Sequence, residues 1–282
     1  MINFGVRAHD FGTNISPEEL ADRIAAKGFT SIQLALTKTI SGVPAAPGYL
    51  NPGLVGYVKD EFQKRGIRVA VVGSYIDPVN PDPEKRRLEI ERFKEYTRYA
   101  RSLGSNVVGT ETGRYSGSSA DVAKNRGEEA FQVMVASAKE MAAEAEKCGV
   151  FACIEGVVGH TIYCPERMKQ LIDAVNSDYL QVILDTSNYI DESNYMKQDE
   201  IIKKSFELFG DRIVAFHCKD FIIDENGKKK KVPAGTGMLN YELLLSLAKK
   251  YKPYSHLLLE EVDDIETLDE SRKILTEIYE RV

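Results

Sequence analysis

Eight short runs of mostly β-branched and aliphatic residues recur along this chain, and longer stretches with helical spacing separate them. The runs span residues 2–8, 31–36, 68–74, 106–111, 150–155, 180–185, 212–217 and 256–261. This alternation is typical of βα units arranged around a parallel sheet. It restricts the folds open to the chain, because each strand is expected to be followed by a helix.

Helix boundaries in the sequence agree with this division. Ser16 and Pro17, followed by Glu19, predict an N-cap, a proline at the first helical position and a capping box. Asp82-Pro83 repeats part of this signal, and Thr267 with Glu270 is a further candidate cap. Glycines follow five helical stretches, where a left-handed residue is expected to end each helix: Gly28, Gly66, Gly104, Gly149 and Gly210.

The length of 282 residues, without a linker, repeat array or low-complexity segment, bounds the architecture. Eight βα units in this length predict an α/β fold, a (β/α)8 TIM barrel in a single domain over residues 1–282. The first βα loop lacks G-x-G-x-x-G, and no G-x-x-x-x-G-K-[ST] occurs, so Rossmann and P-loop folds lack their phosphate loop. In a barrel, the chemistry is expected at the carboxyl ends of the strands.

Charge and composition exclude several kinds of partner. The chain has 37 basic and 43 acidic residues, a net charge of −6, so no overall positive field would attract nucleic acid. Arg7, His9 and Asp10 interrupt the start of the chain, and no run approaches the roughly 18 apolar residues of a membrane span. We therefore expect a cytoplasmic protein. The cysteines have no C-x-x-C spacing and are expected to be reduced thiols: Cys148, Cys153, Cys164 and Cys218.

The last four predicted strands end in the same way, with an apolar residue followed by a potential metal ligand. The pairs are Ile154-Glu155, Leu184-Asp185, Phe216-His217 and Leu259-Glu260. Because side chains alternate across a strand, the ionisable member of each pair can face the barrel axis. Three convergent carboxylates would repel one another, and a divalent cation would remove that conflict. Three carboxylates and one imidazole suit a Mn²⁺, Mg²⁺, Co²⁺ or Zn²⁺ ion.

Glu261 competes with Glu260 for the fourth ligand position. Matching the phase of the other three strands selects Glu260.

At these residues the chain resembles the xylose isomerase-like barrel superfamily, which groups sugar (phosphate) isomerases and epimerases with inosose dehydratase and endonuclease IV. The resemblance rests on RAHDFG at 7–12, GTETG at 109–113, CIEG at 153–156, LDTSN at 184–188, HCKD at 217–220, PAGTGMLNY at 233–241 and LLLEE at 257–261. It implies one divalent ion held by Glu155, Asp185, His217 and Glu260. It also implies that Glu155 and Glu260 exchange protons with a small sugar or polyol through a metal-stabilised enediolate.

The sequence also departs from some of these relatives. Similar ketose 3-epimerases have an acid, a histidine and an arginine where this chain has Thr161, Asn188 and Ile223, which disfavours ketose C3 epimerisation. Endonuclease IV needs extra histidines for a three-zinc cluster, and only four histidines occur in the chain, so DNA repair is disfavoured. Two alternatives to an isomerase or epimerase stay open: an inosose dehydratase-like lyase, in which the enediolate loses water, and a non-catalytic sugar-binding barrel.

Further residues near the strand ends are candidates for substrate binding. We expect His9, Glu111, Asn188 and Lys219 to contact the substrate, although each could have a structural role instead. Asp220 could orient the site, and His160 is expected to be a surface or packing residue. The chain could also form a homo-oligomer.

A basic run, Lys228 to Lys231, follows Asn226-Gly227, which predicts a hairpin with a two-residue loop. We expect these lysines to be solvated rather than bound to a phosphate.

Overall fold

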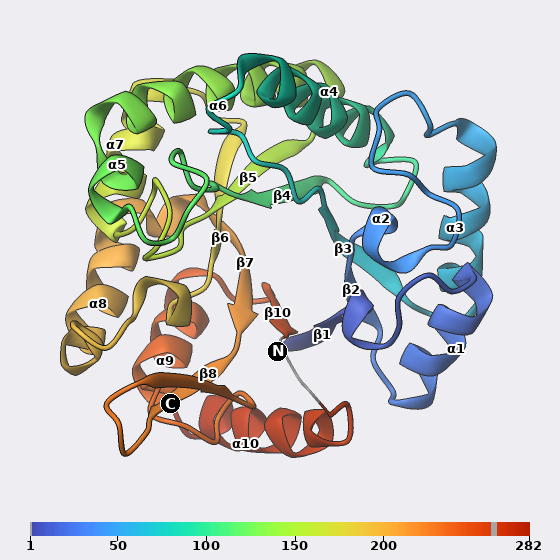
Figure 1. Cartoon of the computed structure of the whole chain (residues 1–282). Coiled ribbons are helices and arrows are strands. Elements are labelled where there is room, and N and C mark those ends of the chain that lie inside the picture. The colour runs from blue at the N-terminus through green and yellow to red at the C-terminus, as the bar shows by residue number, and fades with distance from the viewer. Residues whose placement is uncertain (1, 261–263) are drawn as a thin grey trace.

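The computed structural model describes residues 2–260 and 264–282, and its centre is a closed barrel of eight parallel strands (Figure 1). The strands are β1 Asn3–Arg7, β2 Ser31–Leu34, β3 Arg68–Gly73, β4 Val107–Glu111, β5 Phe151–Glu155, β6 Leu180–Leu184, β7 Ile213–Cys218 and β10 His256–Leu259. Their order around the barrel is β1-β10-β7-β6-β5-β4-β3-β2. Seven of these strands lie within a predicted run, and β7 extends one residue beyond its run of 212–217. The prediction of a single-domain TIM barrel is confirmed.

Helices surround the barrel, as Figure 1 shows. The longer ones are α1 Pro17–Ala26, α3 Pro52–Lys64, α4 Pro83–Tyr99, α6 Glu128–Cys148, α7 Pro165–Val175, α8 Gln198–Phe209, α9 Tyr241–Tyr251 and α10 Thr267–Arg281. Short turns of helix lie in the connections: α2 Leu36–Thr39, α5 Val122–Arg126, and the 3₁₀ segments η1 Ala8–Asp10, η2 Ser187–Tyr189, η3 Tyr195–Lys197 and η4 Gly210–Arg212. None of the described helices is long and apolar enough to cross a membrane.

The helix ends follow the sequence signals with two exceptions. Ser16 Oγ accepts a hydrogen bond from Glu19 N at 3.2 Å, as a capping residue should. Thr267 is not the N-cap of α10; Glu266 occupies that position, and the Thr267 hydroxyl donates to the Asp264 carbonyl instead. Gly210 does not adopt a left-handed conformation, because its φ is −58° and the chain continues directly into η4.

The interior of the barrel is a small apolar layer. It consists of Val71, Cys153, Ile183, Ala215 and Leu258. Two glycines make room for the larger members of this layer: a Cβ on Gly109 would lie 2.5 Å from Ile183 Cδ1, and one on Gly5 would lie 2.6 Å from Leu258 Cδ2. Burying each such side chain stabilises the fold by about 1.5–3 kcal/mol. This packed layer closes the barrel beneath the strand ends.

The next inward-facing positions, two residues further along each strand, form a second ring. This ring is polar except at β3: Arg7, Gln33, Gly73, Glu111, Glu155, Asp185, His217 and Glu260. The strand pairing places Arg7 opposite Gln33, and Glu111 opposite Glu155. The alternation of the strands thus brings most of the ionisable residues to one end of the barrel.

An antiparallel hairpin of β8 Asp220–Ile223 and β9 Lys229–Val232 follows β7. The predicted hairpin is present, but its loop is longer than expected, because Asp224 N donates to Lys228 O at 2.9 Å and three residues lie between them. Gly227 supplies the left-handed residue that such a loop needs, with φ +71°.

The basic run on this hairpin is not uniformly solvated, contrary to expectation. Lys229 Nζ donates to the carbonyl oxygens of Ser187 at 2.6 Å and Ile190 at 2.8 Å, which ties the hairpin to the loop after β6. Lys230 pairs with Asp224 at 3.0 Å.

Candidate metal and proton-transfer site

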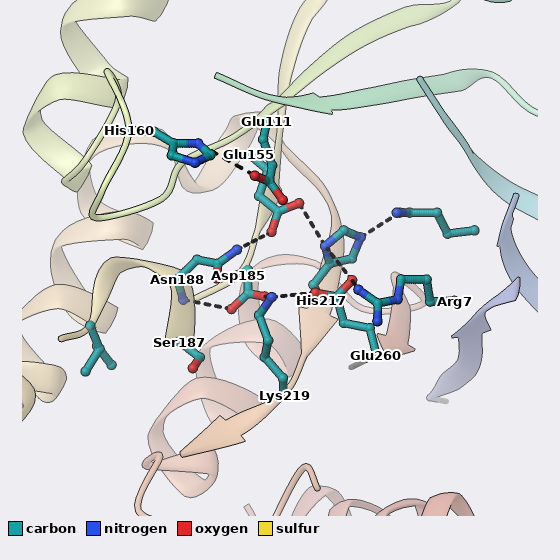
Figure 2. A network of polar contacts seen from close by, with 12 residues as sticks. Arg7, Glu111, Glu155, His160, Asp185, Ser187, Asn188, His217, Lys219 and Glu260 are labelled. Carbon is teal, nitrogen blue, oxygen red and sulfur yellow. Dashed lines mark hydrogen bonds and ion pairs between the residues drawn. The ribbon is translucent and has the colours of Figure 1, made fainter. Parts of the chain in front are cut away.

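The four residues predicted as metal ligands meet at the carboxyl end of the barrel (Figure 2). Glu155 ends β5, Asp185 follows β6, His217 lies near the end of β7 and Glu260 follows β10. Each offers one ligand atom, and these atoms all lie within 4.8 Å of one another. All four side chains are buried. Glu261, the alternative ligand considered from the sequence, lies outside the described residues.

His217 is held in one orientation by a partner on the far side of its ring. Its Nε2 lies 2.6 Å from Gln33 Oε1, and Gln33 Nε2 in turn donates to the Tyr75 hydroxyl at 2.7 Å. The amide oxygen can only accept, so Nε2 carries the proton. His217 Nδ1 therefore faces Glu155 Oε2 at 3.0 Å and Glu260 Oε2 at 3.4 Å.

Glu155 is fixed through its second oxygen. Asn188, in η2, donates from Nδ2 to Glu155 Oε1 at 2.6 Å, and its backbone N–H donates to Asp185 Oδ1 at 3.0 Å. Asn188 therefore holds two of the four clustered side chains, those of Glu155 and Asp185, at the same time. Its side chain contacts Glu155, and the contact with the substrate that the sequence suggests for Asn188 stays a prediction.

Two cations lie against Glu260 and Asp185. Lys219 Nζ is 2.7 Å from Glu260 Oε1 and 3.0 Å from Asp185 Oδ2. Arg7 lies further away, with a guanidinium nitrogen 3.9 Å from Glu260 Oε2, and it forms a closer pair with Asp10 at 2.7 Å. These groups compensate part of the negative charge that the three carboxylates bring into the barrel.

The cluster shifts the pKa values of its members in opposite directions. Burial raises the pKa of Asp185 to about 7, although Lys219 opposes this shift. Burial would lower the pKa of His217, but Glu155 and Glu260 outweigh it and raise the pKa to about 9. For Glu260, burial is outweighed by His217, Lys219 and Arg7, which hold its pKa well below the usual range.

The donor set fits a divalent cation. Asp185 Oδ2 and His217 Nδ1 are buried and form no regular hydrogen bond among the described residues, although each has an ion-pair contact at 3.0 Å, with Lys219 and Glu155 respectively. Buried polar atoms are seldom left unsatisfied in native proteins, and both atoms face the other carboxylates. Oxygen ligands with one imidazole nitrogen match the preferences of Mg²⁺, Mn²⁺, Co²⁺ and Zn²⁺.

Sequence and structure comparisons identify the family. The profile of the xylose isomerase-like TIM barrel family matches residues 21–278, which is most of the chain. The chain belongs to this family. A search of curated proteins finds no match.

Several solved structures of this barrel type are similar to the chain over nearly their whole length. A D-tagatose 3-epimerase-like protein has a TM-score of 0.77 at 20% identity, and covers 100% of this chain and 98% of its own. The IolI protein with a bound zinc atom has a TM-score of 0.75 at 18% identity, with 99% of both chains covered. A xylose isomerase-like TIM barrel protein from Mycobacterium smegmatis in complex with magnesium has a TM-score of 0.74 at 16% identity, covering 99% and 96%. These likenesses show the shared fold.

Other predicted site residues of this xylose isomerase-like barrel lie around the cluster. Glu111 projects from the end of β4 beside His160, whose Nδ1 is 3.6 Å from Glu111 Oε2. Burial and the neighbouring Glu155 raise the pKa of Glu111 to about 7. His9, in η1, packs edge-on against Tyr75 with 5.7 Å between ring centroids, and burial lowers its pKa to about 3. His160 is buried, which agrees with the packing alternative rather than the surface one.

Asp220 does not contact the clustered ligands among the described residues. Its carboxylate accepts four backbone hydrogen bonds instead, from residues 221, 235, 237 and 239 at 2.7–3.1 Å. Asp220 therefore orders the loop that follows the hairpin, and so supports the segment in which Lys219 lies.

Gln33 and Arg7 were not singled out as site residues from the sequence. Gln33 is the residue that sets the orientation of His217, and it lies in the predicted strand 31–36 between apolar neighbours. A polar residue at an inward position of a buried strand was the available signal. Arg7 ends the first strand at the same level of the barrel.

Proposed function

We propose that this chain is a divalent-metal-dependent isomerase or epimerase of a small sugar or polyol, and that Glu155 and Glu260 transfer the proton. The observation that supports this most directly is the placement of the two glutamates. They come from β5 and β10, and their Oε2 atoms lie 3.0 Å and 3.4 Å from the same nitrogen of His217. Two carboxylates from separate strands can approach one bound molecule from different sides, as an epimerase requires.

Glu155, Asp185, His217 and Glu260 would hold the ion. When bound, a divalent ion polarises a substrate carbonyl and lowers the free energy of the negative charge that develops next to it. His217 is prepared for this role because Gln33 occupies its Nε2 and leaves Nδ1 for the ion.

The proton transfer can be written for this chain's own residues. Glu155 takes the proton from the carbon next to the carbonyl. The electron pair of that C–H bond forms a carbon–carbon double bond, and the π pair of the carbonyl moves to its oxygen, which gives the enediolate. Glu260, once protonated, then delivers its proton to the carbon, where the electron pair of the double bond takes it up, and the oxygen pair re-forms the carbonyl. Lys219 Nζ, 2.7 Å from Glu260 Oε1, is placed to supply that proton and to recover one from solvent.

Substrate binding is assigned to residues at the edge of the cluster. Glu111 and His9 are half-buried near the cluster, and the buried His9 Nδ1 has no hydrogen-bond partner among the described residues. Their positions suit contacts to substrate hydroxyls. Lys219 would contact the substrate from the side of Glu260.

Exchange of a carbon-bound proton with deuterated solvent tests this function. Wild-type protein with added Mn²⁺ should incorporate deuterium into at least one member of a panel of small ketoses, aldoses and inososes. Glu155→Gln and Glu260→Gln should each reduce the exchange rate by about 10²–10⁴-fold. Metal content is measured in every variant, since loss of the ion would imitate loss of a base. Glu140→Gln, on the outer surface of α6, is the matched control.

The outcomes separate the alternatives. Deuterium uptake accompanied by loss of water would identify a lyase acting on the same cluster. Ligand binding with no exchange in any member of the panel would indicate a non-catalytic sugar-binding barrel. Wild-type exchange in a fully metallated Glu155→Gln protein would show that Glu155 is not the base.

A further inference from the structure

A cavity of about 510 Å³ lies beside the four clustered ligand residues and extends outward from them. Glu111, Asn188 and Lys219 line its inner part, next to the clustered ligands. The loops after β3, β4 and β5 and strand β9 also contribute to its wall, through Asp77, Gly113, Arg114, Gly117, Val157, His160 and Lys231. A molecule that reaches Glu155 from this cavity would therefore extend past the loop after β4.

The backbone on both sides of Arg114 is fixed in that loop. Gly113 O accepts a hydrogen bond from Thr161 N at 3.2 Å, and Arg114 O accepts one from Gly117 N at 2.8 Å. Gly113 has a φ of +69°, and a Cβ there would overlap the Asp77 carboxylate. The tight turn requires glycine at 113, and it directs the next residue toward the cavity.

The Arg114 guanidinium has no partner within residues 2–260 and 264–282. Its Nε is buried without a hydrogen-bond partner. No carboxylate oxygen in that part of the chain lies within 4.0 Å of its nitrogens, although Asp77 lines the same wall. Other arginines near the barrel mouth differ: Arg7 is paired with Asp10, and Arg92 with Glu89. Arg126 and Arg167 also have a buried Nε without a hydrogen-bond partner, but their terminal nitrogens donate to Val158 O at 2.7 Å and to Glu128 at 3.1 Å. Among the described residues, the Arg114 guanidinium has no such acceptor at any of its nitrogens, so an acceptor from a ligand is expected.

A second cation faces this cavity from another element. Lys231, on β9, lines it together with Arg114, and Asp77 is the acid at this outer end. Among the described residues that line this outer part, two side chains are basic and one is acidic. This contrasts with the inner part, where three carboxylates converge.

We propose that Arg114 binds an anionic group of the substrate, so that the substrate is a sugar derivative bearing a carboxylate or a phosphate. This inference rests on the proposed function, because it assumes that the reacting carbons lie at Glu155 and Glu260. The anionic group lies at the outer end of the cavity, away from the carboxylate cluster that would repel it. A guanidinium presents parallel N–H donors that match either oxyanion in a two-point contact.

Three probes with the same ketose core test the proposal: D-fructose, D-fructuronate and D-fructose 6-phosphate. Their dissociation constants are measured by calorimetry on the full-length protein, with and without Mn²⁺. At least one anionic probe should bind ten or more times more tightly than D-fructose. A preference for fructuronate would identify a carboxylate substrate, and a preference for the 6-phosphate would identify a phosphorylated one.

Substitutions locate the effect. In Arg114→Gln the advantage of the anionic probe should fall below threefold, while the affinity for D-fructose stays the same. Arg114→Lys keeps the charge but loses the two-point contact, and should retain part of the advantage. The matched control is Arg68→Gln, an exposed arginine at the start of β3 on the opposite end of the barrel. It should retain the full advantage.

The proposal is overturned if no anionic probe binds more tightly than D-fructose, including the case in which none of the probes binds. It is also overturned if the advantage survives in Arg114→Gln. Failure of the proposed function has a different signature: the anionic preference depends on Arg114, yet no deuterium exchange occurs with any sugar. Exchange that proceeds equally well in Arg114→Gln with anionic substrates would instead leave the proposed function intact and refute the anion subsite.

Discussion

The Nε2 atom of His217 lies 2.6 Å from the side-chain oxygen of Gln33, so a residue on β2 determines which nitrogen of a β7 histidine faces the carboxylate cluster. This contact joins strands that are not neighbours in the barrel. It fixes both the ring orientation and the position of the proton. A ligand histidine with a fixed ring loses less entropy when it binds a metal.

Replacing Gln33 with leucine should weaken metal binding without removing a ligand. Gln33→Leu leaves the His217 Nε2–H without its acceptor, so the affinity for Mn²⁺ or Zn²⁺ should fall about 10–100-fold. Competition with a chromogenic chelator measures this change. Gln181→Leu is the matched control, because Gln181 is a buried strand glutamine whose side chain bonds the Asp178 carbonyl at 2.7 Å and, in the described part of the chain, no residue of the cluster. Equal metal affinity in both variants would contradict the orienting role of Gln33.

Asn188 should act on proton transfer through Glu155. Its amide donates to Glu155 Oε1 at 2.6 Å, and Asn188→Ala would release that oxygen. A hydrogen bond to a charged group contributes about 1.5–3 kcal/mol, so the deuterium-exchange rate should fall roughly 10–100-fold. The loss should be in kcat more than in KM. An increase in KM with unchanged kcat would instead indicate the direct substrate contact that the sequence suggested.

The sequence predicts the barrel well because the apolar runs of the strands and the helical spacing of the stretches between them are both unambiguous. Apolar runs such as 150–155 and 180–185 are buried strands. On each strand, the residue two positions after the one in the inner apolar layer also faces the barrel axis. The same rule places Glu155 and Glu260 in one cluster. Phase along a strand is a local property, so a single sequence can reveal it.

Contacts between loops that are distant in sequence cannot be predicted from the alternation of side chains along the strands. Asn188 contacts Glu155 because η2 turns the chain back over the barrel, and Lys229 is anchored to that same turn. Arg114 faces the cavity because of the turn conformation at Gly113. These arrangements depend on backbone conformations in the loops, which residue types alone do not determine.

Asp220 should contribute strongly to stability through the loop after the hairpin. Its two oxygens accept four backbone N–H groups, and a Cβ at Gly237 would overlap this carboxylate, so the loop is built closely around it. Asp220→Asn replaces an acceptor oxygen with a donor that opposes two of those N–H groups. The free energy of unfolding should fall by about 2–4 kcal/mol.

Urea denaturation measures this loss, with Asp224→Asn as the comparison. Asp224 accepts backbone bonds from Asn226 and Lys228 and pairs with Lys230, but all three partners are exposed on the hairpin, where water can replace them. Its variant should lose less than about 1 kcal/mol. A similar loss in the two proteins would contradict the importance of the buried position of Asp220.

His160 should make the folded protein less stable as the pH falls. Burial lowers its pKa from 6.5 to about 4, and Arg114 acts in the same direction. Between these values the unfolded chain binds more protons than the folded one, so the stability that the neutral imidazole contributes is present above pH 6.5 and is lost as the pH falls toward 4. Glu111, 3.6 Å away, has a raised pKa and acts in the opposite sense, which makes the absolute stability curve a poor test.

A comparison with His160→Gln isolates the histidine, since the direct contributions of other titrating groups are common to both proteins. Unfolding free energies from urea titrations at pH 7.5 and pH 5.0 are subtracted, wild type minus variant. One pKa unit corresponds to 1.36 kcal/mol, so this difference should decrease by up to about 2 kcal/mol at the lower pH. Both proteins are measured with a metal chelator present, so that metal release at low pH does not contribute. Parallel stability curves for the two proteins would mean that the imidazole is readily protonated in the folded state, and that water reaches it through the cavity it lines.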